Sequence, residues 1–226
     1  MREEESTISK LEAWQPKTVL GKKVKAGEIT SIDEVLNSGL KILEPEIVEM
    51  LVPNLEIELL AVGQSKGKFG GGKGSIWKQT QKKTSEGNVI KFAAFAAVGN
   101  RNGIIGVGFG DAKETLPARE KAMRNAKLNI INIRKGCGSW DCGCGEVHSI
   151  PYKVDGKCGS VRMSILPAPK GAGLVVEKKC QKLLELAGIK DAYSRSSGQT
   201  KTRLNLFFAC FDALSYLSKM RTEEKK

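Results

Sequence analysis

The stretch from Arg134 to Gly159, RKGCGSWDCGCGEVHSIPYKVDGKCG, constrains the fold more than any other part of the chain. It contains four of the six cysteines and the single histidine, and it separates two halves with different residue patterns. At 226 residues, 40% of them hydrophobic, the chain is longer than the usual single domain. Two small domains joined by a cysteine-rich link over residues 136–149 are therefore expected.

The cysteine spacing in this link predicts a metal site. Three thiols and one imidazole fall within twelve residues, enough for the closed tetrahedral site of a structural zinc ion with ligands Cys137, Cys142, Cys144 and His148. Glycine at positions 136, 138, 143 and 145 lets the backbone fold around a small ion. Free thiols in a tight turn, a disulfide and another metal are the alternatives. We hypothesise that the ion stiffens a link too poor in apolar residues to order itself.

Charge is distributed unevenly along the chain. Lys and Arg total 37 against 25 acidic residues, yet residues 1–60 carry a net −5 and residues 61–226 a net +17. Such asymmetry is typical of a chain that binds a polyanion, most often nucleic acid. A basic face that only meets water is the alternative that composition leaves open.

No run reaches the roughly 18 to 20 apolar residues that a membrane span needs, and the N-terminal MREEESTISK is acidic where a signal peptide is basic and then apolar. We therefore expect a soluble cytoplasmic protein without a membrane partner. Its cysteines are expected to stay reduced, which favours metal binding over disulfides.

Residues 1–54 are predicted to form an acidic helical extension. Ser31 and Glu34 make a capping box at the start of one helix, and Gly39 ends it. Pro45 at a first helical position starts a second helix, which Pro53 stops. Nothing in the extension indicates chemistry, and we expect it to pack against a neighbour.

Residues 55–135 are predicted to form a βββα domain of an α+β protein. Alternation over 55–62 fits one strand, and 89–98 and 104–109 fit two more. Asn102-Gly103 supplies the positive φ angles of a tight hairpin turn between the last two. The glycines at 106, 108 and 110 resemble a dinucleotide fingerprint, but after a hairpin strand they indicate close approach of another element.

A helix over 116–133 should follow these strands. Its apolar face is predicted to carry Ala118, Ala122, Met123, Ala126 and Ile130, with Lys121, Arg124 and Lys127 roughly opposite. The order of strands and helix, with basic loops, matches an RNA-binding βββα unit. An ordinary amphipathic helix with a solvated basic face is the alternative.

Between Gly63 and Lys83 the chain has six lysines and no acidic residue, with too much glycine to order itself. Gly67, Gly72 and Lys73 match the phosphate loop of nucleotide hydrolases, but residue 74 is glycine where a Mg²⁺-binding hydroxyl belongs, and no apolar helix follows. The loop is therefore predicted to be flexible and cationic, suited to a phosphate chain, with Trp77 as a stacking surface.

Residues 150–218 are predicted to form a second α+β domain of βαβα type, followed by a charged tail over 219–226. Alternation from Val161 to Ile165 fits a strand, and LPAPKGAG enforces a rigid turn. The next helix ends at Gly188, and the polar segment DAYSRSSG follows it.

A last helix presents the apolar residues between Leu204 and Leu217 to the core of this domain. The remaining cysteines are expected to be buried thiols at positions 158, 180 and 210.

Five blocks spanning nearly the whole chain resemble one known family: AWQPKTVLGKKVKAGEITSIDE, AAVGNRNGIIGVGFGDAKE, NAKLNIINIRKGCGSWDCGCGEVHSIPYKV, GKCGSVRMSILPAPKGAGLV and LAGIKDAYSR. They are similar to the universal fifth protein of the small ribosomal subunit, in its archaeal form. The resemblance implies an N-terminal domain related to double-stranded-RNA-binding folds and a C-terminal domain with a left-handed βαβ crossover. It also implies a ribosomal location, contact with small-subunit rRNA, neighbouring ribosomal proteins and mRNA where it enters the subunit, and a part in decoding accuracy.

The rRNA-reaching loop of this family maps onto residues 81–92, where Thr84, Gly87 and Phe92 keep the pattern. Residues 63–78 look like an insertion, so an RNA contact there is inferred from charge alone. Arg119 and Glu120 depart from the family pattern, and no RNA role is assigned to them.

The predicted RNA-binding residues are lysines and arginines of the basic loops and helix, together with two loop residues that keep the family pattern: Lys66, Lys68, Lys73, Lys78, Lys82, Lys83, Thr84, Gly87, Lys91, Arg101, Lys121, Arg124, Lys127, Arg134 and Lys135.

A structural rRNA-binding constituent of the small subunit is therefore the predicted function, with no small-molecule substrate. An RNA-binding protein outside the ribosome is the alternative. A nucleotide hydrolase using residues 67–73 or a zinc hydrolase using His148 is not expected, because the sequence offers no second acidic motif, open metal position or nucleophile–base pair.

Overall fold

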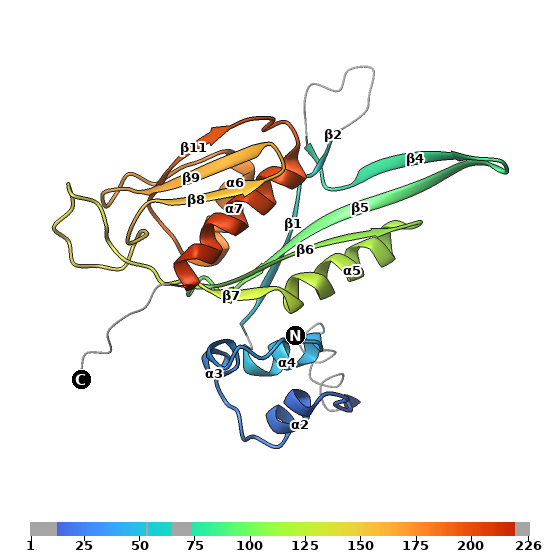
Figure 1. Cartoon of the computed structure of the whole chain (residues 1–226), viewed down its shortest axis with the longest axis horizontal. Coiled ribbons are helices and arrows are strands. Elements are labelled where there is room, and N and C mark those ends of the chain that lie inside the picture. Colours follow the sequence, from blue (N-terminus) through green and yellow to red (C-terminus); the bar gives the residue numbers. More distant parts are fainter. Residues whose placement is uncertain (1–12, 53, 65–73, 220–226) are drawn as a thin grey trace.

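Two larger sheets organise the chain, which a computed structural model describes over residues 13–52, 54–64 and 74–219 (Figure 1). The first sheet is antiparallel, in the order β1-β5-β6-β7, with β4 also paired to β5. Its strands are β1 (Glu56–Leu60), β4 (Lys78–Thr84), β5 (Gly87–Gly99), β6 (Ile104–Ala112) and β7 (Ile130–Asn132). A separate short pair joins β2 (Gly63–Gln64) to β3 (Gly74–Ser75).

Strand β5 spans 13 residues and belongs to two different environments. Its inner half pairs with β1 on one edge and β6 on the other, and every residue from Ala93 to Gly99 is buried. Its outer end, before Phe92, pairs only with β4. Residues 78–91 therefore leave the sheet as a two-stranded arm, which Figure 1 shows extending away from the domain.

Helix α5 (Thr115–Leu128) covers one face of the first sheet. The glycines of β6 make this close approach possible: a Cβ at Gly108 would lie 2.1 Å from the Ala126 nitrogen, and one at Gly110 2.4 Å from the Ala118 oxygen. The predicted close approach at these glycines is thus made by this helix, through small residues such as Ala122.

The second sheet has the order β10-β11-β9-β8, with β10 and β11 parallel and the other pairs antiparallel. Its elements are β8 (Val154–Cys158), β9 (Val161–Pro167), β10 (Leu174–Val175), α6 (Lys178–Ala187), β11 (Ala192–Ser197) and α7 (Arg203–Ser218). Helix α6 connects the two parallel strands and ends at Gly188, whose φ of 79° is the left-handed cap expected there.

The two domains share one hydrophobic core. The face of the first sheet opposite α5 supplies Phe95, Ile105 and Val107, which cluster with buried residues of α6 and α7. Phe95 packs against Phe207 with ring centroids 5.1 Å apart. The relative position of the domains therefore rests on this apolar contact as well as on the link.

From residue 13 on, the described part of the N-terminal extension contains the short helices α2 (Val19–Lys25), α3 (Ile32–Asn37) and α4 (Pro45–Leu51). The N-cap half of the predicted capping box is confirmed, since the Ser31 hydroxyl accepts a hydrogen bond from the Glu34 backbone, and Pro45 begins α4 as predicted. Their apolar residues cluster with Ile104 and Ile130, so the extension packs against its own domain. Pro53 lies outside the described residues.

Several sequence expectations need correction. The positive φ angles of the β5–β6 turn fall at Arg101 and Gly103, not at Asn102 and Gly103 as predicted, because the connection is a longer loop and not a two-residue turn. Helix α5 ends at Leu128, and Ile130 belongs to β7, because β6 offers a free edge with which the strand can pair and its two isoleucines are β-branched. The polar segment after Gly188 is strand β11, and part of the glycine-rich loop is strand β4. Helix α2 and strand β8 had no prediction. Cys180 and Cys210 are buried as predicted, whereas Cys158 is only half-buried.

Candidate metal centre and nucleic-acid interface

The four predicted metal ligands converge in the link. The ligand atoms of Cys137, Cys142, Cys144 and His148 all lie within 4.8 Å of one another. The Sγ atoms of Cys142 and Cys144 are 3.2 Å apart, and those of Cys144 and Cys137 are 3.7 Å apart. The Nε2 atom of His148 lies 3.6 Å from Cys142 Sγ.

These separations fit a tetrahedral zinc ion. Bonds of about 2.3 Å to sulfur and about 2.0 Å to nitrogen put two sulfurs about 3.8 Å apart, and a sulfur and a nitrogen about 3.5 Å apart. Two of these three separations agree within a few tenths of an ångström, and the Cys142–Cys144 pair is shorter. The cluster has the donors and the dimensions to bind a metal.

Backbone contacts bring the two ends of the link together. Gly136 and Ser149 exchange both backbone hydrogen bonds at 2.9 Å, and the Gly138 nitrogen donates to the Ile150 carbonyl. A Cβ at Gly138 would lie 1.9 Å from the Pro151 oxygen, so only glycine fits. These bonds close the link into a loop, and the Cys142 nitrogen, bonded to the Ser139 carbonyl, turns it inward.

His148 is fixed from the side opposite the thiols by Asp191. Its Nδ1 atom lies 2.8 Å from Asp191 Oδ2, and both side chains are buried. The two atoms are in close contact, although Nδ1 makes no well-directed hydrogen bond. The contact leaves Nε2 pointing at the cysteines, as a ligand nitrogen must.

Asp191 connects this histidine to the C-terminal domain. Its Oδ1 atom accepts hydrogen bonds from the backbones of Gly171 (3.1 Å) and Gly173 (2.8 Å), in the turn before β10. The Ser149 hydroxyl donates to the Asp191 carbonyl and accepts from Ala168. Sequence reasoning missed Asp191, because no local spacing relates it to a histidine 43 positions earlier.

The thiols have unequal proton affinities. A backbone hydrogen bond from Lys170, followed by one from the Cys144 thiol, lowers the pKa of Cys142 to about 6. Desolvation, followed by the neighbouring thiols, raises the pKa of Cys137 to about 11. One ligand is therefore available as thiolate at neutral pH, and a cation at the centre would favour deprotonation of the other thiols.

The arm carries half of the predicted RNA-binding residues that the structure describes. Every residue of β4 is exposed, including Lys78, Lys82 and Lys83, and Lys91 is exposed on β5. The Thr84 hydroxyl donates to the Gly87 carbonyl at 2.7 Å, and Gly87 has a φ of 119° that favours glycine. Thr84 and Gly87, two of the three residues that keep the family pattern, thus shape the tip of the arm.

Several predicted cations are engaged by carboxylates. Lys121 Nζ lies 2.8 Å from Asp111 Oδ1, and Lys91 Nζ lies 3.9 Å from Oδ2 of the same side chain. Lys121 lowers the pKa of Asp111 by hydrogen bonding and by its charge. Arg101 forms an exposed ion pair with Glu56. All three cations keep more than half of their side-chain surface exposed.

The prediction that Lys127 faces RNA needs correction. Its ammonium pairs with Glu49 of α4, and its side chain is only 15% exposed, because the N-terminal extension covers this part of α5. Lys135 is half-buried, and desolvation, followed by the charge of Lys190, lowers its pKa. Arg124 and Arg134 are exposed. The predicted residues Lys66, Lys68 and Lys73 lie outside the described residues.

The fold and these features define a two-domain α+β protein with a metal-site cluster of the structural kind and an exposed cationic arm. In the described part of the chain no helix is long and apolar enough to cross a membrane.

Comparison with known proteins gives the family. Residues 76–134 match "Ribosomal protein S5, N-terminal domain", and residues 156–226 match "Ribosomal protein S5, C-terminal domain". The chain is 52% identical over 213 residues to "Small ribosomal subunit protein uS5" of Nanoarchaeum equitans, covering 94% of this chain and 91% of that protein. It is 48% identical to the protein of the same name from Methanocaldococcus jannaschii, covering 95% and 92%. The chain therefore belongs to the ribosomal protein S5 family, a family of structural ribosomal proteins and not of enzymes.

Proposed function

We propose that this chain is an rRNA-binding structural constituent of the small subunit of cytoplasmic ribosomes. The observation that carries the proposal is the similarity to archaeal uS5 proteins along nearly the whole chain. We further propose, as the family resemblance implies, that it lies near the path along which mRNA enters, contacts neighbouring ribosomal proteins and supports decoding accuracy.

The arm supports an RNA role on physical grounds. An isolated two-stranded ribbon buries too little apolar surface to be stabilised by its side chains, so burial does not account for its length. Its lysines project from a hydrogen-bonded backbone into solvent, where they can follow phosphates without first being desolvated. We infer that the arm reaches rRNA with Lys78, Lys82, Lys83, Thr84, Gly87 and Lys91.

A second set of candidate contacts lies outside the arm: Lys121 is near its base, whereas Arg101 and Lys135 lie at the opposite end of β5, by the β5–β6 turn. We propose that Arg101, Lys121, Arg124, Arg134 and Lys135 also face RNA. Lys121 and Arg101 would exchange an exposed carboxylate for a phosphate, which costs little because such surface ion pairs contribute about 0 to 1 kcal/mol. Lys66, Lys68 and Lys73 stay predicted contacts on the strength of their charge alone. We also infer a relation of the N-terminal domain to double-stranded-RNA-binding folds, and a left-handed β10–α6–β11 crossover.

We propose that Cys137, Cys142, Cys144 and His148 bind a structural zinc ion. The closed set of four protein ligands leaves no position for substrate, so the ion would supply cross-linking and no reaction. Through His148 and Asp191 it would fasten the link to the turn before β10. Because the two domains share a hydrophobic core, the proposed role of the ion is limited to ordering the link, and the core sets the position of the two domains.

Sedimentation of an extract that contains the tagged chain tests the ribosomal role. A structural constituent should travel with small subunits through a gradient in high salt, because many buried contacts hold it there. Recovery at the top of the gradient, with RNA binding retained in vitro, would instead favour the alternative of an RNA-binding protein outside the ribosome.

A matched control separates charge from assembly. The variant Lys22→Ala/Lys23→Ala/Lys41→Ala removes three exposed cations from the N-terminal extension and should still sediment with small subunits.

A further inference from the structure

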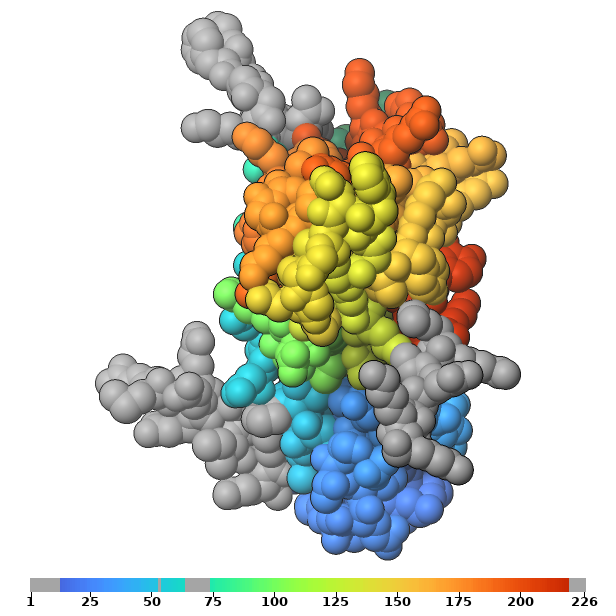
Figure 2. Space-filling model, turned by 90° about the vertical axis from the view of Figure 1, so that its left-hand side faces the viewer, coloured from blue at the N-terminus to red at the C-terminus, as the bar shows by residue number. Residues whose placement is uncertain are grey.

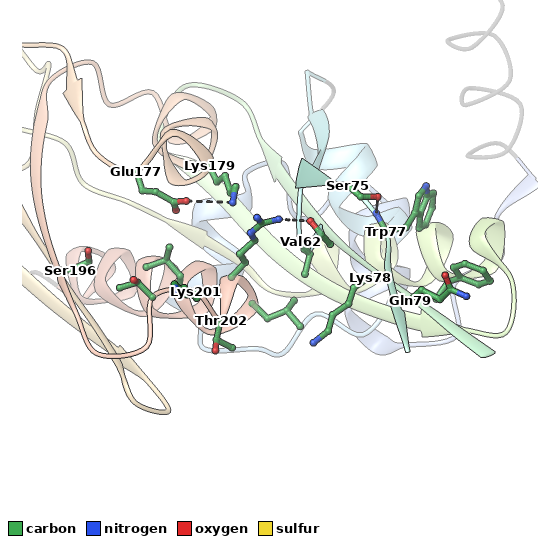
Figure 3. A pocket seen from close by; sticks show the side chains of 16 residues that line it. Val62, Ser75, Trp77, Lys78, Gln79, Glu177, Lys179, Ser196, Lys201 and Thr202 are labelled. Atoms are coloured by element: carbon green, nitrogen blue, oxygen red, sulfur yellow. Dashed lines mark hydrogen bonds and ion pairs between the residues drawn. The ribbon is translucent and has the colours of Figure 1, made fainter. Parts of the chain in front are cut away.

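A groove lies between the base of the arm and the C-terminal domain, and apart from Lys78 its lining has no part in the function proposed above. It encloses a volume of about 1120 Å³. In Figure 3 one wall carries Val62, Ser75, Trp77, Lys78 and Gln79, and the other carries Glu177, Lys179, Ser196, Lys201 and Thr202. The second wall is built where α6 and α7 begin and β11 ends.

The groove is strongly cationic. Four cations line it, Lys78, Lys179, Lys201 and Arg203, against the single carboxylate of Glu177. Lys179 lies 3.7 Å from that carboxylate. Within the described ranges neither Lys78 nor Lys201 has an ion-pair partner, so the positive charge of the groove is not neutralised internally. A polyanion would be attracted to it.

Arg203 has a different task from the other cations. Its guanidinium donates to the Gly63 carbonyl and so joins the first turn of α7 to β2. This bond holds the two walls together. Arg203 therefore fixes the shape of the groove, and the remaining cations supply its charge.

Hydroxyl groups accompany the cations. Ser75, Ser196, Thr200 and Thr202 line the groove, and the side chain of Thr202, directly before α7, makes no capping hydrogen bond. Hydroxyls and cations together are the groups that proteins use to contact phosphate and sugar oxygens. The volume also exceeds the roughly 300 to 1,000 Å³ of most small-molecule pockets, whose linings are mostly apolar. A polymer fits the groove better than a metabolite.

We propose that this groove binds the sugar–phosphate backbone of an extended single-stranded RNA segment. The inference rests on the proposed function, since it takes RNA as the partner and adds where the RNA binds and that it binds as a single strand. A strand lying between two walls is reached by Lys78 from one side and Lys201 from the other. A duplex, whose two backbones are separated by grooves about 6 to 12 Å wide, does not fit inside a volume of about 1120 Å³ and meets outward-facing surfaces such as the arm instead.

Binding of a labelled uridine dodecamer to the full-length, metal-loaded protein tests the groove. Lys78→Ala/Lys201→Ala should lower affinity about fivefold at 0.1 M salt and reduce the slope of log affinity against log salt by about 1.4, because two phosphates of a single strand are no longer neutralised. The matched control, Lys23→Ala/Lys41→Ala, removes two exposed cations of the N-terminal extension and should leave both quantities unchanged.

A photocrosslinking amino acid gives an independent readout of position. Placed at Ser196, on the wall of the groove, it should crosslink to the dodecamer, whereas the same group at Leu43, exposed in the N-terminal extension, should not. The inference is overturned if Ser196 gives no crosslink, if the groove and control variants lose affinity equally, or if an oligoglutamate of matched charge displaces the RNA as well as RNA does.

These results separate the two proposals. A wild-type protein that binds small-subunit rRNA through the arm but does not bind the dodecamer removes the groove and leaves the proposed function intact. A wild-type protein that binds neither RNA and does not sediment with small subunits removes the proposed function itself.

Discussion

The arm and the cysteine-rich link are both too poor in apolar residues to build a core, and the chain orders them in opposite ways. The arm continues the hydrogen-bond ladder of β5 beyond the sheet, so every side chain of β4 stays exposed. The link folds back on itself at the surface, where Figure 2 shows yellow residues beside the orange C-terminal domain, and its thiols and imidazole converge. Backbone pairing thus leaves the side chains of the arm free to contact a partner, whereas the thiols and imidazole of the link face one another.

Removal of one ligand is expected to have the largest effect. Cys142→Ser should abolish stoichiometric zinc binding and lower the melting temperature by about 10 °C. The reason is that a few kcal/mol of binding energy is lost, and each kcal/mol corresponds to about 2 to 4 °C in a chain of this size. Metal analysis and calorimetry measure both. Wild-type protein without stoichiometric zinc would remove the metal proposal. Cys158→Ser, which changes a thiol outside the cluster, is the control.

Loss of the carboxylate behind His148 should have a smaller effect on the same site. Asp191→Asn removes a negative charge 2.8 Å from Nδ1 and should weaken zinc affinity about 10- to 100-fold, as for other carboxylates that orient a histidine ligand. Competition with a chromophoric chelator measures this affinity. Ser149→Ala breaks the bond to the Asp191 backbone but leaves the carboxylate in place, so it should cost stability without changing affinity. Equal zinc affinities in Asp191→Asn and wild type would show that Asp191 does not position the ligand.

Substitutions in the arm should change RNA affinity and leave the stability of the fold unchanged. Lys82→Ala/Lys83→Ala/Lys91→Ala should lower affinity for small-subunit rRNA about tenfold and flatten its salt dependence by roughly one unit of slope for each phosphate that is no longer neutralised. The melting temperature should stay unchanged, because these side chains are exposed. An unchanged slope would show that these lysines do not bind phosphates. The triple variant at Lys22, Lys23 and Lys41 is the charge-matched control.

The smallest effect is expected at the base of the arm. Lys121 lowers the pKa of Asp111 below its ordinary value of 3.8, so the ion pair stabilises the fold above that pH and the contribution disappears as the pH falls through the lowered pKa. Asp111→Asn should therefore melt no more than about 2 °C below wild type at pH 7, as expected for an exposed pair, and at the same temperature near pH 2. Melting curves at the two pH values measure the difference. A gap that persists at pH 2 would mean that Asp111 acts through something other than its charge.

The sequence predicted those features whose causes are local. The sequence placed a hairpin between β5 and β6, although the positive φ angles of its turn fall at Arg101 and Gly103; Ser31 caps α3, and Gly188 ends α6. The four metal ligands were found because they lie within twelve residues and glycines let the chain turn between them. Each of these signals involves residues only a few positions apart, so predicting it requires no knowledge of contacts between distant parts of the chain.

The tertiary structure decided what depends on distant partners. Strand β11 is polar along most of its length and forms because β9 pairs with all six of its residues, and β7 replaces the end of a predicted helix because β6 offers an edge. Lys127 looked available on a helical wheel, yet Glu49 reaches it from a segment 78 residues earlier. Asp191 behind His148, and the groove between the arm and α7, likewise exist only once separate elements meet. Residue type and spacing fix local chemistry, but burial, pairing and partner choice are set by contacts between elements far apart in the chain.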